Sequence, residues 1–414
     1  MITNNLALDL KIENAALANS TELQTIAIKN GLITNIASAI PIPAVETIDA
    51  RGHLVIPGLI DPHLHLDKAF LLEKSPAKIG DFQEALAETL RLKKAFTIED
   101  IQARARRVIE NAIAFGVTAI RSHVEVDPIL QLTSIQALLP LQQEYAERLT
   151  LQLAIFAQEG ITNQPGTEAL LYQALSLGGD VIGSAPYTDS DPERNISIVF
   201  DLAQTFNCDV DFHLDFLDDD EPLLFPIVAK EAIKRGWQHR VCLGHMTRLA
   251  GLSPEKLQMA AALLKEAGIS VLALPASDLY MMARGDTHNV RRGVAPVHTL
   301  SDSGVNSAIA TNNIQNLFTP FGDGDPLKIC TLLAQTLQLG TEDRHALCLE
   351  MATTRAAKAI GIRDHRIVPG SVADLVILQA SSVSQAIGAA PAGRTTVKAG
   401  RVISQVWRER SLVN

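Results

Sequence analysis

The sequence predicts an α/β protein: a (β/α)8 TIM barrel with a small composite β-sandwich formed by both chain ends. In the middle of the chain, apolar strand-like stretches alternate with long helical stretches, which is typical of βα units and a parallel sheet. Both ends instead carry short stretches in which apolar and polar residues alternate. We therefore expect the sandwich at residues 1–56 and 366–414 and the barrel at residues 57–365.

The two chain ends share one sequence texture. The N-terminal end has alternating stretches at 6–12, 23–28 and 32–36, and the C-terminal end has them at 373–378, 395–399 and 402–404. Asn30 and Gly31 separate the second stretch from the third, and this pair favours the tight turn of a β-hairpin. Neither end is long enough to bury a core alone, so we expect the two to pack together.

Eight strand candidates recur through the chain: 54–61, 119–126, 149–159, 180–185, 209–215, 241–245, 270–275 and 306–311. Helical stretches lie between them, and many begin at Ser, Thr or Asp, which cap helix N-termini. Examples are 101–114, 166–177, 196–206 and 253–267. Eight strand–helix units predict a TIM barrel, whose active site lies where the strands end and the loops to the helices begin.

The composition is that of a globular protein with no nucleic-acid footprint. Hydrophobic residues make up 47% of the chain, and 36 Lys and Arg stand against 46 Asp and Glu, for a net charge of −10. This balance argues against a nucleic-acid partner. We see no run long enough for a membrane span and no secretory signal at the start. Four scattered cysteines without a Cys-x-x-Cys motif favour reduced thiols and a cytoplasmic location.

Two histidines follow the first barrel strand. Side chains alternate across a strand, so His63 and His65 project from one face and can offer two nitrogens to one metal ion. Zn2+ and Fe2+ accept neutral imidazole readily, and a catalytic site needs three or four protein ligands. An isolated His-x-His pair is more often a core histidine beside a surface one, so the rest of the chain must decide.

Polar residues stand at the exits of most other strand candidates. They are Arg121, His123 and Glu125; Gln158 and Glu159; His213 and Asp215; His245; Ser277 and Asp278; and Thr311, Asn312 and Asn313. Core packing alone does not place imidazoles at so many strand ends, so this pattern favours a metal centre. The fourth strand, 180–187, brings no Lys, Cys or Glu that bridges two metals, and we expect one divalent ion.

Several motifs resemble the amidohydrolase superfamily, and within it cytosine deaminase and related metal-dependent hydrolases. They are Ile-Pro-Gly-Leu-Ile-Asp-Pro-His-Leu-His at 56–65 and Val-Pro-Gly-Ser-Val-Ala-Asp-Leu-Val at 368–376, with 121–124, 156–161, 211–215 and 291–294 in the corresponding order. The resemblance implies that His63, His65 and His213 bind Zn2+ or Fe2+. It also implies that His245 contacts the catalytic water and that Gln158 hydrogen-bonds an amide edge of a ring substrate.

The chain departs from this family at two positions. The family has a metal-binding Asp at the end of the eighth strand, where this chain has Asn312, and a Glu three residues after the strand-five histidine, where it has Phe216. An amide offers a weaker oxygen ligand and no useful basicity. The site therefore keeps the histidines expected to hold the metal, which would act as the electrophile. It lacks the Asp and the Glu that carry protons in the family. Nearby replacements are Asp215, Asp278, Glu159, Asp67 and the acidic run 218–221.

We expect three residue sets at the site. The metal ligands are His63, His65, His213 and Asn312; the catalytic residues are His245, Asn312 and Asp215; and the substrate contacts are Gln158, Lys68, Phe216 and Asp278. Arg284, Asp286 and His288 are further candidates for substrate contact, equally compatible with surface roles.

The function we expect is metal-dependent hydrolysis of a C–N bond, in the manner of a deaminase, in a small cyclic amide or amidine such as a pyrimidine or triazine analogue. One alternative is a metal-dependent hydrolase of N-acyl, carbamate or thiocarbamate compounds. A second, motivated by Asn312 and Phe216, is a catalytically impaired relative that binds a small molecule. The expected partner is a small-molecule substrate, without nucleic acid or membrane. A homo-oligomer stays open, as does the choice between zinc and iron.

Overall fold

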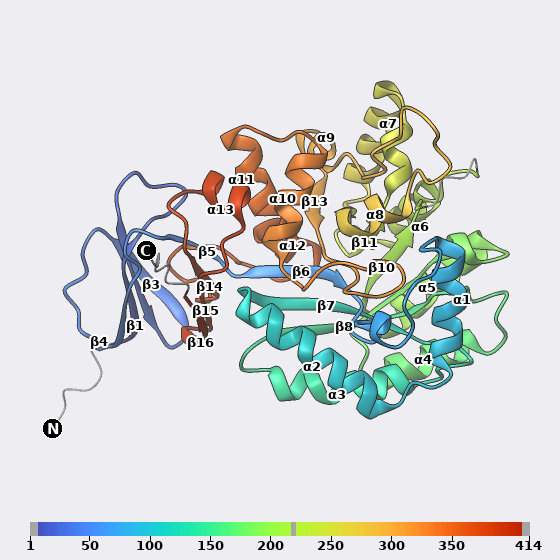
Figure 1. Cartoon of the computed structure of the whole chain (residues 1–414), viewed down its shortest axis with the longest axis horizontal. Helices are drawn as coiled ribbons and strands as arrows, with labels where there is room; N and C mark the ends of the chain where they lie inside the picture. The colour runs from blue at the N-terminus through green and yellow to red at the C-terminus, as the bar shows by residue number, and fades with distance from the viewer. Residues whose placement is uncertain (1–6, 217–220, 408–414) are drawn as a thin grey trace.

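The computed structural model describes residues 7–216 and 221–407, which form a two-sheet β unit at one end of the molecule and a barrel at the other (Figure 1). The barrel sheet has eight strands in the order β13-β12-β11-β10-β9-β8-β7-β6, and neighbouring strands pair in parallel. Its strands are β6 (Leu59–Leu64), β7 (Val117–Glu125), β8 (Thr150–Ala157), β9 (Val181–Ser184), β10 (Asp209–Leu214), β11 (Val241–His245), β12 (Ser270–Ala273) and β13 (Asn306–Ile309). The predicted TIM barrel is confirmed.

The first and last barrel strands meet through main-chain contacts at their carboxyl ends. The Asn312 N–H donates to the His63 carbonyl, and the His65 N–H donates to the Asn312 carbonyl, each at 2.9 Å. These contacts close the sheet at the end where the strands leave the barrel. They also bring the segment after β13 beside the two histidines of β6.

Helices surround the sheet. They are α1 (Phe82–Lys93), α2 (Ile98–Ala114), α3 (Thr133–Tyr145), α4 (Thr167–Leu177), α5 (Pro192–Phe206), α6 (Phe225–Arg235), α7 (Pro254–Glu266), α8 (Pro275–Met281), α9 (Val297–Asp302), α10 (Pro326–Thr336), α11 (Glu342–Met351), α12 (Thr354–Ala359) and α13 (Val383–Ala389). Short 3-10 turns occur at η1 (Leu71–Glu73), η2 (Pro186–Thr188) and η3 (Thr247–Gly251). In α2, Ile101, Ala105, Val108, Ile109 and Ala112 are buried, the spacing expected of a helix with one apolar face. Among the described residues, no helix is both long and apolar enough to cross a membrane.

Both chain ends contribute to the β unit. One sheet has the order β3-β2-β1-β4, with β1 (Leu8–Ala15), β2 (Gln24–Lys29), β3 (Leu32–Ala37) and β4 (Ala44–Asp49). The other has the order β16-β15-β14-β5, with β5 (Leu54–Pro57), β14 (Leu375–Leu378), β15 (Arg394–Lys398) and β16 (Arg401–Val406). Ile12 and Ile26 of the first sheet share one buried core with Val55 and Ile377 of the second. The predicted hairpin turn is confirmed, since Asn30 and Gly31 link β2 to β3 with positive φ.

The expected strand at 54–61 is wrong as a single element. Gly58 divides it, so that β5 pairs with β14 in the β unit and β6 enters the barrel. A Cβ at Gly58 would lie 2.3 Å from Thr118 Oγ1, so only glycine fits where the chain crosses between the sheets. The change from one sheet to the other could not be predicted from the sequence, because both strands are buried and residues 54–61 are therefore uniformly hydrophobic.

A fully buried ion pair joins the C-terminal strands to the barrel. Asp325 is the residue just before α10. The Arg394 guanidinium on β15 donates to both of its carboxylate oxygens, at 2.8 and 2.7 Å. Both side chains are 0% exposed. Removal of one charge therefore leaves the other buried without a counter-ion.

We expect Asp325→Asn to lower the free energy of unfolding by about 3–5 kcal/mol, because the Arg394 charge stays buried and uncompensated. Urea denaturation followed by circular dichroism measures this loss. Glu147→Gln is the matched control, since Glu147 pairs with Arg401 where the two side chains are 85% and 74% exposed. An equal loss in both variants would contradict the importance of burial.

Candidate active site

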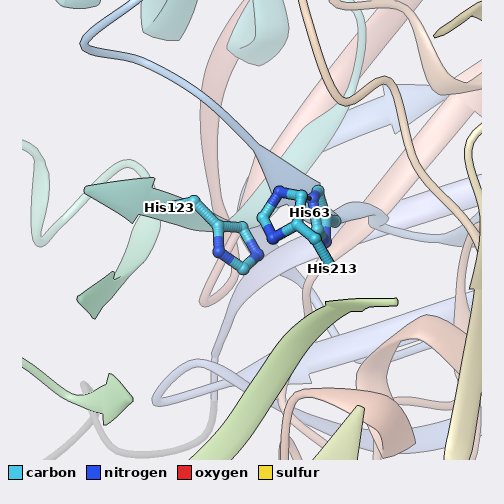
Figure 2. Close-up of side chains that lie close together, drawn as sticks. All are labelled: His63, His123 and His213. Atoms are coloured by element: carbon cyan, nitrogen blue, oxygen red, sulfur yellow. Dashed lines mark hydrogen bonds between the residues drawn. The ribbon is translucent and has the colours of Figure 1, made fainter. Parts of the chain in front are cut away.

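Three imidazoles converge at the carboxyl ends of β6 and β10. His63 is the residue before Leu64, the last residue of β6, and His65 comes directly after that strand. His213 lies one residue before the end of β10. The Nε2 atom of His213 lies 3.0 Å from Nε2 of His63 and 3.1 Å from Nε2 of His65. Figure 2 shows the rings of His63 and His213 close together, with His123 beside them. The barrel thus brings together residues 150 positions apart in the chain.

This geometry fits one metal ion. A tetrahedral ion bound at about 2.0–2.1 Å separates its nitrogen ligands by roughly 3.3 Å, close to the spacing seen here. Burial, helped by neighbouring charges, lowers the pKa of His65 and of His213 well below the ordinary value, and burial lowers the pKa of His63 to about 3. The three rings are therefore neutral. A single N–H on His213 Nε2 cannot satisfy the Nε2 atoms of both His63 and His65. A divalent cation satisfies all three nitrogens at once.

Asn312 is the candidate for a fourth donor. Its main chain is tied between His63 and His65, and its φ of 63° lies in the left-handed region, which asparagine tolerates. The side-chain Nδ2 donates to Ser277 Oγ at 2.8 Å, and Ser277 in turn contacts Thr319 Oγ1. Asn312 Oδ1 is buried and has no hydrogen-bond partner among the described residues. An oxygen so placed is suited to a metal ligand.

A buried carboxylate lies behind the imidazoles. Asp211 precedes His213 by two residues on β10, and its Oδ1 lies 3.7 Å from His63 Nδ1 and 3.5 Å from His123 Nε2. Arg121 Nη1 donates to the other carboxylate oxygen at 3.0 Å. Burial opposes ionisation of Asp211, but His123, His63 and Arg121 outweigh it and hold the pKa of Asp211 well below its usual range. Such a carboxylate orients the ring and raises the basicity of a ligating histidine.

His245, at the end of β11, forms a dyad with Asp278. Its Nδ1 lies 2.7 Å from Asp278 Oδ1, and the second carboxylate oxygen accepts the Leu274 N–H at 3.1 Å. The Nδ1 side is thereby committed to Asp278, and the Nε2 edge of the ring faces the cavity, which His245 lines. Phe216 packs against this imidazole with ring centroids 4.1 Å apart. The arrangement holds one tautomer of His245, with Nε2 free to accept a proton.

The side chains above the imidazoles line a small pocket. Its walls are His65, Lys68, Phe82, Gln158, Tyr187, His213, Phe216, His245, Ser277, Met281, Asn312, Asn313 and Phe318. Four aromatic rings with Met281 make a flat apolar enclosure, which suits a planar ring. Among the described residues that line it, none carries a carboxylate.

Lys68 enters the cavity wall from an ionic network that is mostly buried. Its Nζ lies 3.0 Å from Glu125 Oε2 and 3.5 Å from Gln158 Oε1. Lys93, the last residue of α1, pairs with Glu125, Asp127 and Glu159. Burial works against ionisation of Glu125, yet the two lysines hold the pKa of Glu125 far below its ordinary value. This network holds Lys68 beside Glu125 and ties α1, which carries Phe82, to the ends of β7 and β8.

The other residues singled out from the sequence have different places. The Asp215 carboxylate accepts the N–H groups of Leu224 and Phe225 at the start of α6, rather than lining the cavity. Asp278 lies behind His245 instead of in the wall, and Glu159 pairs with Lys93. The remaining candidates outside the wall are Asp67, Arg284, Asp286 and His288. Residues 218–220 of the acidic run lie outside the described part of the chain.

Sequence reasoning did not assign roles to Asp211, His123 or Lys93. A signal existed for the first two, because Asp211 shares the strand face of His213, and His123 stands between Arg121 and Glu125 on β7. Lys93 gave no signal, since it closes a helix that precedes β7 and reaches the site only through the packing of α1.

Comparisons with known proteins show the family to which this chain belongs. The model of the amidohydrolase family, of the type Amidohydro_3, matches residues 46–96 and 73–404. An N-isopropylammelide isopropyl amidohydrolase of Pseudomonas sp. (strain ADP) is 29% identical over 406 residues, covering 95% of this chain and 97% of its own. A pterin deaminase of Rhizobium rhizogenes is 27% identical over 387 residues, covering 92% of this chain and 87% of its own.

A solved structure matches the whole fold closely. The 5-methylcytosine deaminase of Klebsiella pneumoniae, in complex with 5-fluorocytosine, superimposes with a TM-score of 0.92 at 30% sequence identity. The match covers 97% of this chain and 99% of that one. The likeness therefore includes the barrel, the β unit and the loops between them.

We expect Asn312→Asp to raise the affinity for a divalent metal by at least about tenfold, because a carboxylate adds charge to a set of neutral ligands. Competition with a chromophoric chelator measures the dissociation constant. Asn313→Asp is the control, since it adds the same charge one residue further along the cavity wall. Equal gains in the two variants would show a general charge effect and remove Asn312 from the ligand set.

Asp211→Asn should weaken metal retention by about 10- to 100-fold through the loss of the carboxylate behind His63. Elemental mass spectrometry after dialysis against a chelator gives the metal content per chain. Asp209→Asn is the comparison, because Asp209 begins the same strand and pairs with Arg240 away from the imidazoles. Unchanged retention in Asp211→Asn would rule out this supporting role.

Proposed function

The chain belongs to the amidohydrolase family and is a metal-dependent hydrolase of carbon–nitrogen bonds in small cyclic compounds, and we propose that it removes ammonia or an amine from a nitrogen heterocycle at the His63, His65 and His213 centre. The observation that carries the proposal is the convergence of three imidazole nitrogens beneath a small pocket with aromatic side chains in its wall. The names of the relatives support this class, since they describe an amidohydrolase, a pterin deaminase and a 5-methylcytosine deaminase.

The metal would be held by the three histidines with Asn312 Oδ1 as fourth donor. When bound, a divalent ion polarises the substrate and lowers the pKa of water. Three nitrogens and one neutral oxygen suit Zn2+ or Fe2+. The protein's own contribution to binding is a preformed pocket, in which Asp211 fixes His63 and Ser277 fixes the Asn312 amide.

Proton transfer falls to His245. With Asp278 on Nδ1, the Nε2 atom accepts the proton that the attacking water loses as its oxygen bonds to the ring carbon. The imidazolium then returns this proton to the departing nitrogen as the C–N bond breaks, so the products are a ring hydroxyl compound and a free amine. Asp278 stabilises the charged imidazole between these steps, as a buried carboxylate does in other histidine dyads.

Phe216 shapes the pocket instead of carrying protons. Its ring packs on His245 and lies 6.0 Å, centroid to centroid, from the ring of Phe82 on α1. Together these rings make an apolar part of the pocket wall, which favours an aromatic substrate. Gln158 and Lys68 lie in the same wall and would contact the edge of that ring.

The setting of the protein in the cell is part of the same proposal. All four cysteines are buried and unpaired, which fits a reducing cytoplasm. We expect the partner to be a small-molecule substrate. Light scattering tests whether several copies of the chain associate into an oligomer.

A substrate panel tests the reaction. Metal-loaded protein should release ammonia or alkylamine from aminated pyrimidines, triazines or pterins, and chelator-stripped protein or His213→Ala should not. Turnover confined to N-acyl or carbamate compounds would favour the second enzyme hypothesis. Bound metal and ligand without any hydrolysis would favour a binding protein, and hydrolysis by metal-free protein would overturn the metal centre.

We expect Asp278→Asn to lower kcat by roughly 10²- to 10⁴-fold, because His245 loses its tautomer control and the stabilisation of its charged form. Steady-state kinetics on a substrate found in the panel measure this change, and elemental analysis should show unchanged metal content. Asp286→Asn is the control, since Asp286 pairs with the exposed Arg291 outside the cavity. A normal kcat in Asp278→Asn would contradict the dyad.

A further inference from the structure

The Asn312 amide has two unlike ends, and only one of them can bind a cation. Its Oδ1 is buried without a hydrogen-bond partner among the described residues, and its Nδ2 donates to Ser277 Oγ at 2.8 Å. An amide oxygen offers lone pairs to a metal ion, whereas an amide NH2 carries only hydrogens and repels a cation. A carboxylate has two equivalent oxygens, so an Asp at this position would need no fixed orientation. An Asn at this position does need one.

Ser277, on α8, is the partner of the Nδ2 end of this amide. A hydroxyl has one hydrogen to donate and lone pairs that accept. Asn312 Nδ2 takes up a lone pair of Ser277 Oγ, and Thr319 Oγ1, 2.5 Å away, can accept the Ser277 hydrogen. Without Thr319, that hydrogen would turn to the amide oxygen, and the NH2 end would then face the imidazoles. The orientation of the amide thus depends on both hydroxyls.

A tight turn between β13 and α10 holds Thr319 in place. Asn316 Oδ1 accepts the N–H groups of Phe318 and Thr319, each at 3.0 Å, and the Asn316 N–H donates to the Thr319 carbonyl at 3.0 Å. Asn316 Nδ2 in turn donates to Asn313 Oδ1 at 2.6 Å. Ser277, Asn316 and Thr319 are 1%, 0% and 0% exposed. Water therefore does not compete for these bonds, and it does not replace a partner that is removed.

Two other buried hydroxyls in this part of the chain are not bonded in this way. Ser307 on β13 and Thr311, which precedes Asn312, are 0% and 2% exposed. Ser307 Oγ and Thr311 Oγ1 have no hydrogen-bond partner in the part of the chain that the structure describes. Burial alone therefore does not produce the pairing of Ser277 with Thr319, which leads to the Asn312 amide.

We propose that Ser277 and Thr319 are positioning residues that turn the Asn312 amide oxygen toward the metal. The two hydroxyls allow an amide to serve at a position where a carboxylate would need no such support. The proposal rests on the function given above, since it requires the metal at His63, His65 and His213. It makes metal affinity, rather than turnover, the property that the hydroxyl pair controls.

Removal of either hydroxyl tests the proposal. Ser277→Ala and Thr319→Val should each raise the dissociation constant for Zn2+ by about 10- to 100-fold, measured by competition with a chromophoric chelator. Ser307→Ala and Thr311→Val are the matched controls, because each removes a buried hydroxyl without a partner among the described residues, and neither should change the constant. Circular dichroism checks that all four variants are folded. An unchanged constant in Ser277→Ala would overturn the proposal, and one in Thr319→Val would overturn the role of Thr319.

A double variant separates orientation of the amide from general support of the site. In the Asn312→Asp background either carboxylate oxygen can face the metal, so Ser277→Ala should leave the dissociation constant within about twofold of Asn312→Asp alone. A merely structural role for Ser277 would instead produce the same loss in both backgrounds, and that result would overturn the positioning role. Retained affinity in the double variant also shows that the protein folds without the Ser277 hydroxyl.

The outcomes distinguish this inference from the proposed function, because metal affinity is measured without turnover. The expected loss of affinity in Ser277→Ala, without hydrolysis of any aminated ring by the native protein, would support the positioning role and reject the reaction. Hydrolysis by the metal-loaded native protein, with equal Zn2+ affinity in native and Ser277→Ala protein, would support the reaction and reject the positioning role. A native protein that binds no Zn2+ or Fe2+ would overturn both.

Discussion

A divalent cation among neutral imidazoles is the constraint on which the rest of this structure depends. The Nε2 atoms of His63, His65 and His213 lie close enough to share one ion, but they bring no negative charge. A charge buried without compensation is costly, so the surroundings must supply the balance. The parallel barrel makes this feasible, because the carboxyl ends of all its strands meet at one end of the molecule (Figure 1).

The compensating carboxylates lie one layer behind the cavity wall. Asp211 stands behind His63 with Arg121 as its partner, and Asp278 stands behind His245. Glu125 plays the same part for Lys68. Negative charge is therefore present near each positive or polarised group, but it is shielded from the ligand by the side chain that it supports. The wall itself offers hydrogen-bond donors and aromatic faces, and none of the described residues that line it carries a carboxylate.

Much of this architecture could be predicted from sequence, for a physical reason. Apolar strands that end in polar residues place those residues together in any parallel barrel, so His63, His65, His213 and His245 could be grouped before the fold was known. Their distances could not be predicted, and neither could the Asn312 amide oxygen, which finds no partner in the part of the chain that the structure describes. These depend on how loops leave the strands. Asp215 shows the limit, because its carboxylate is taken up by the N-terminus of α6, while Asp278, expected at the substrate, supports His245.

The loss of two family carboxylates limits how protons can move. Asn312 has no useful basicity and Phe216 has none, so among the described residues of the wall we assign proton transfer to His245, whose Nδ1 contacts Asp278. One imidazole must then accept a proton from water and return it to the leaving nitrogen. This is workable only if that nitrogen accepts the proton as the C–N bond breaks, and if the ring carbon stays electrophilic throughout.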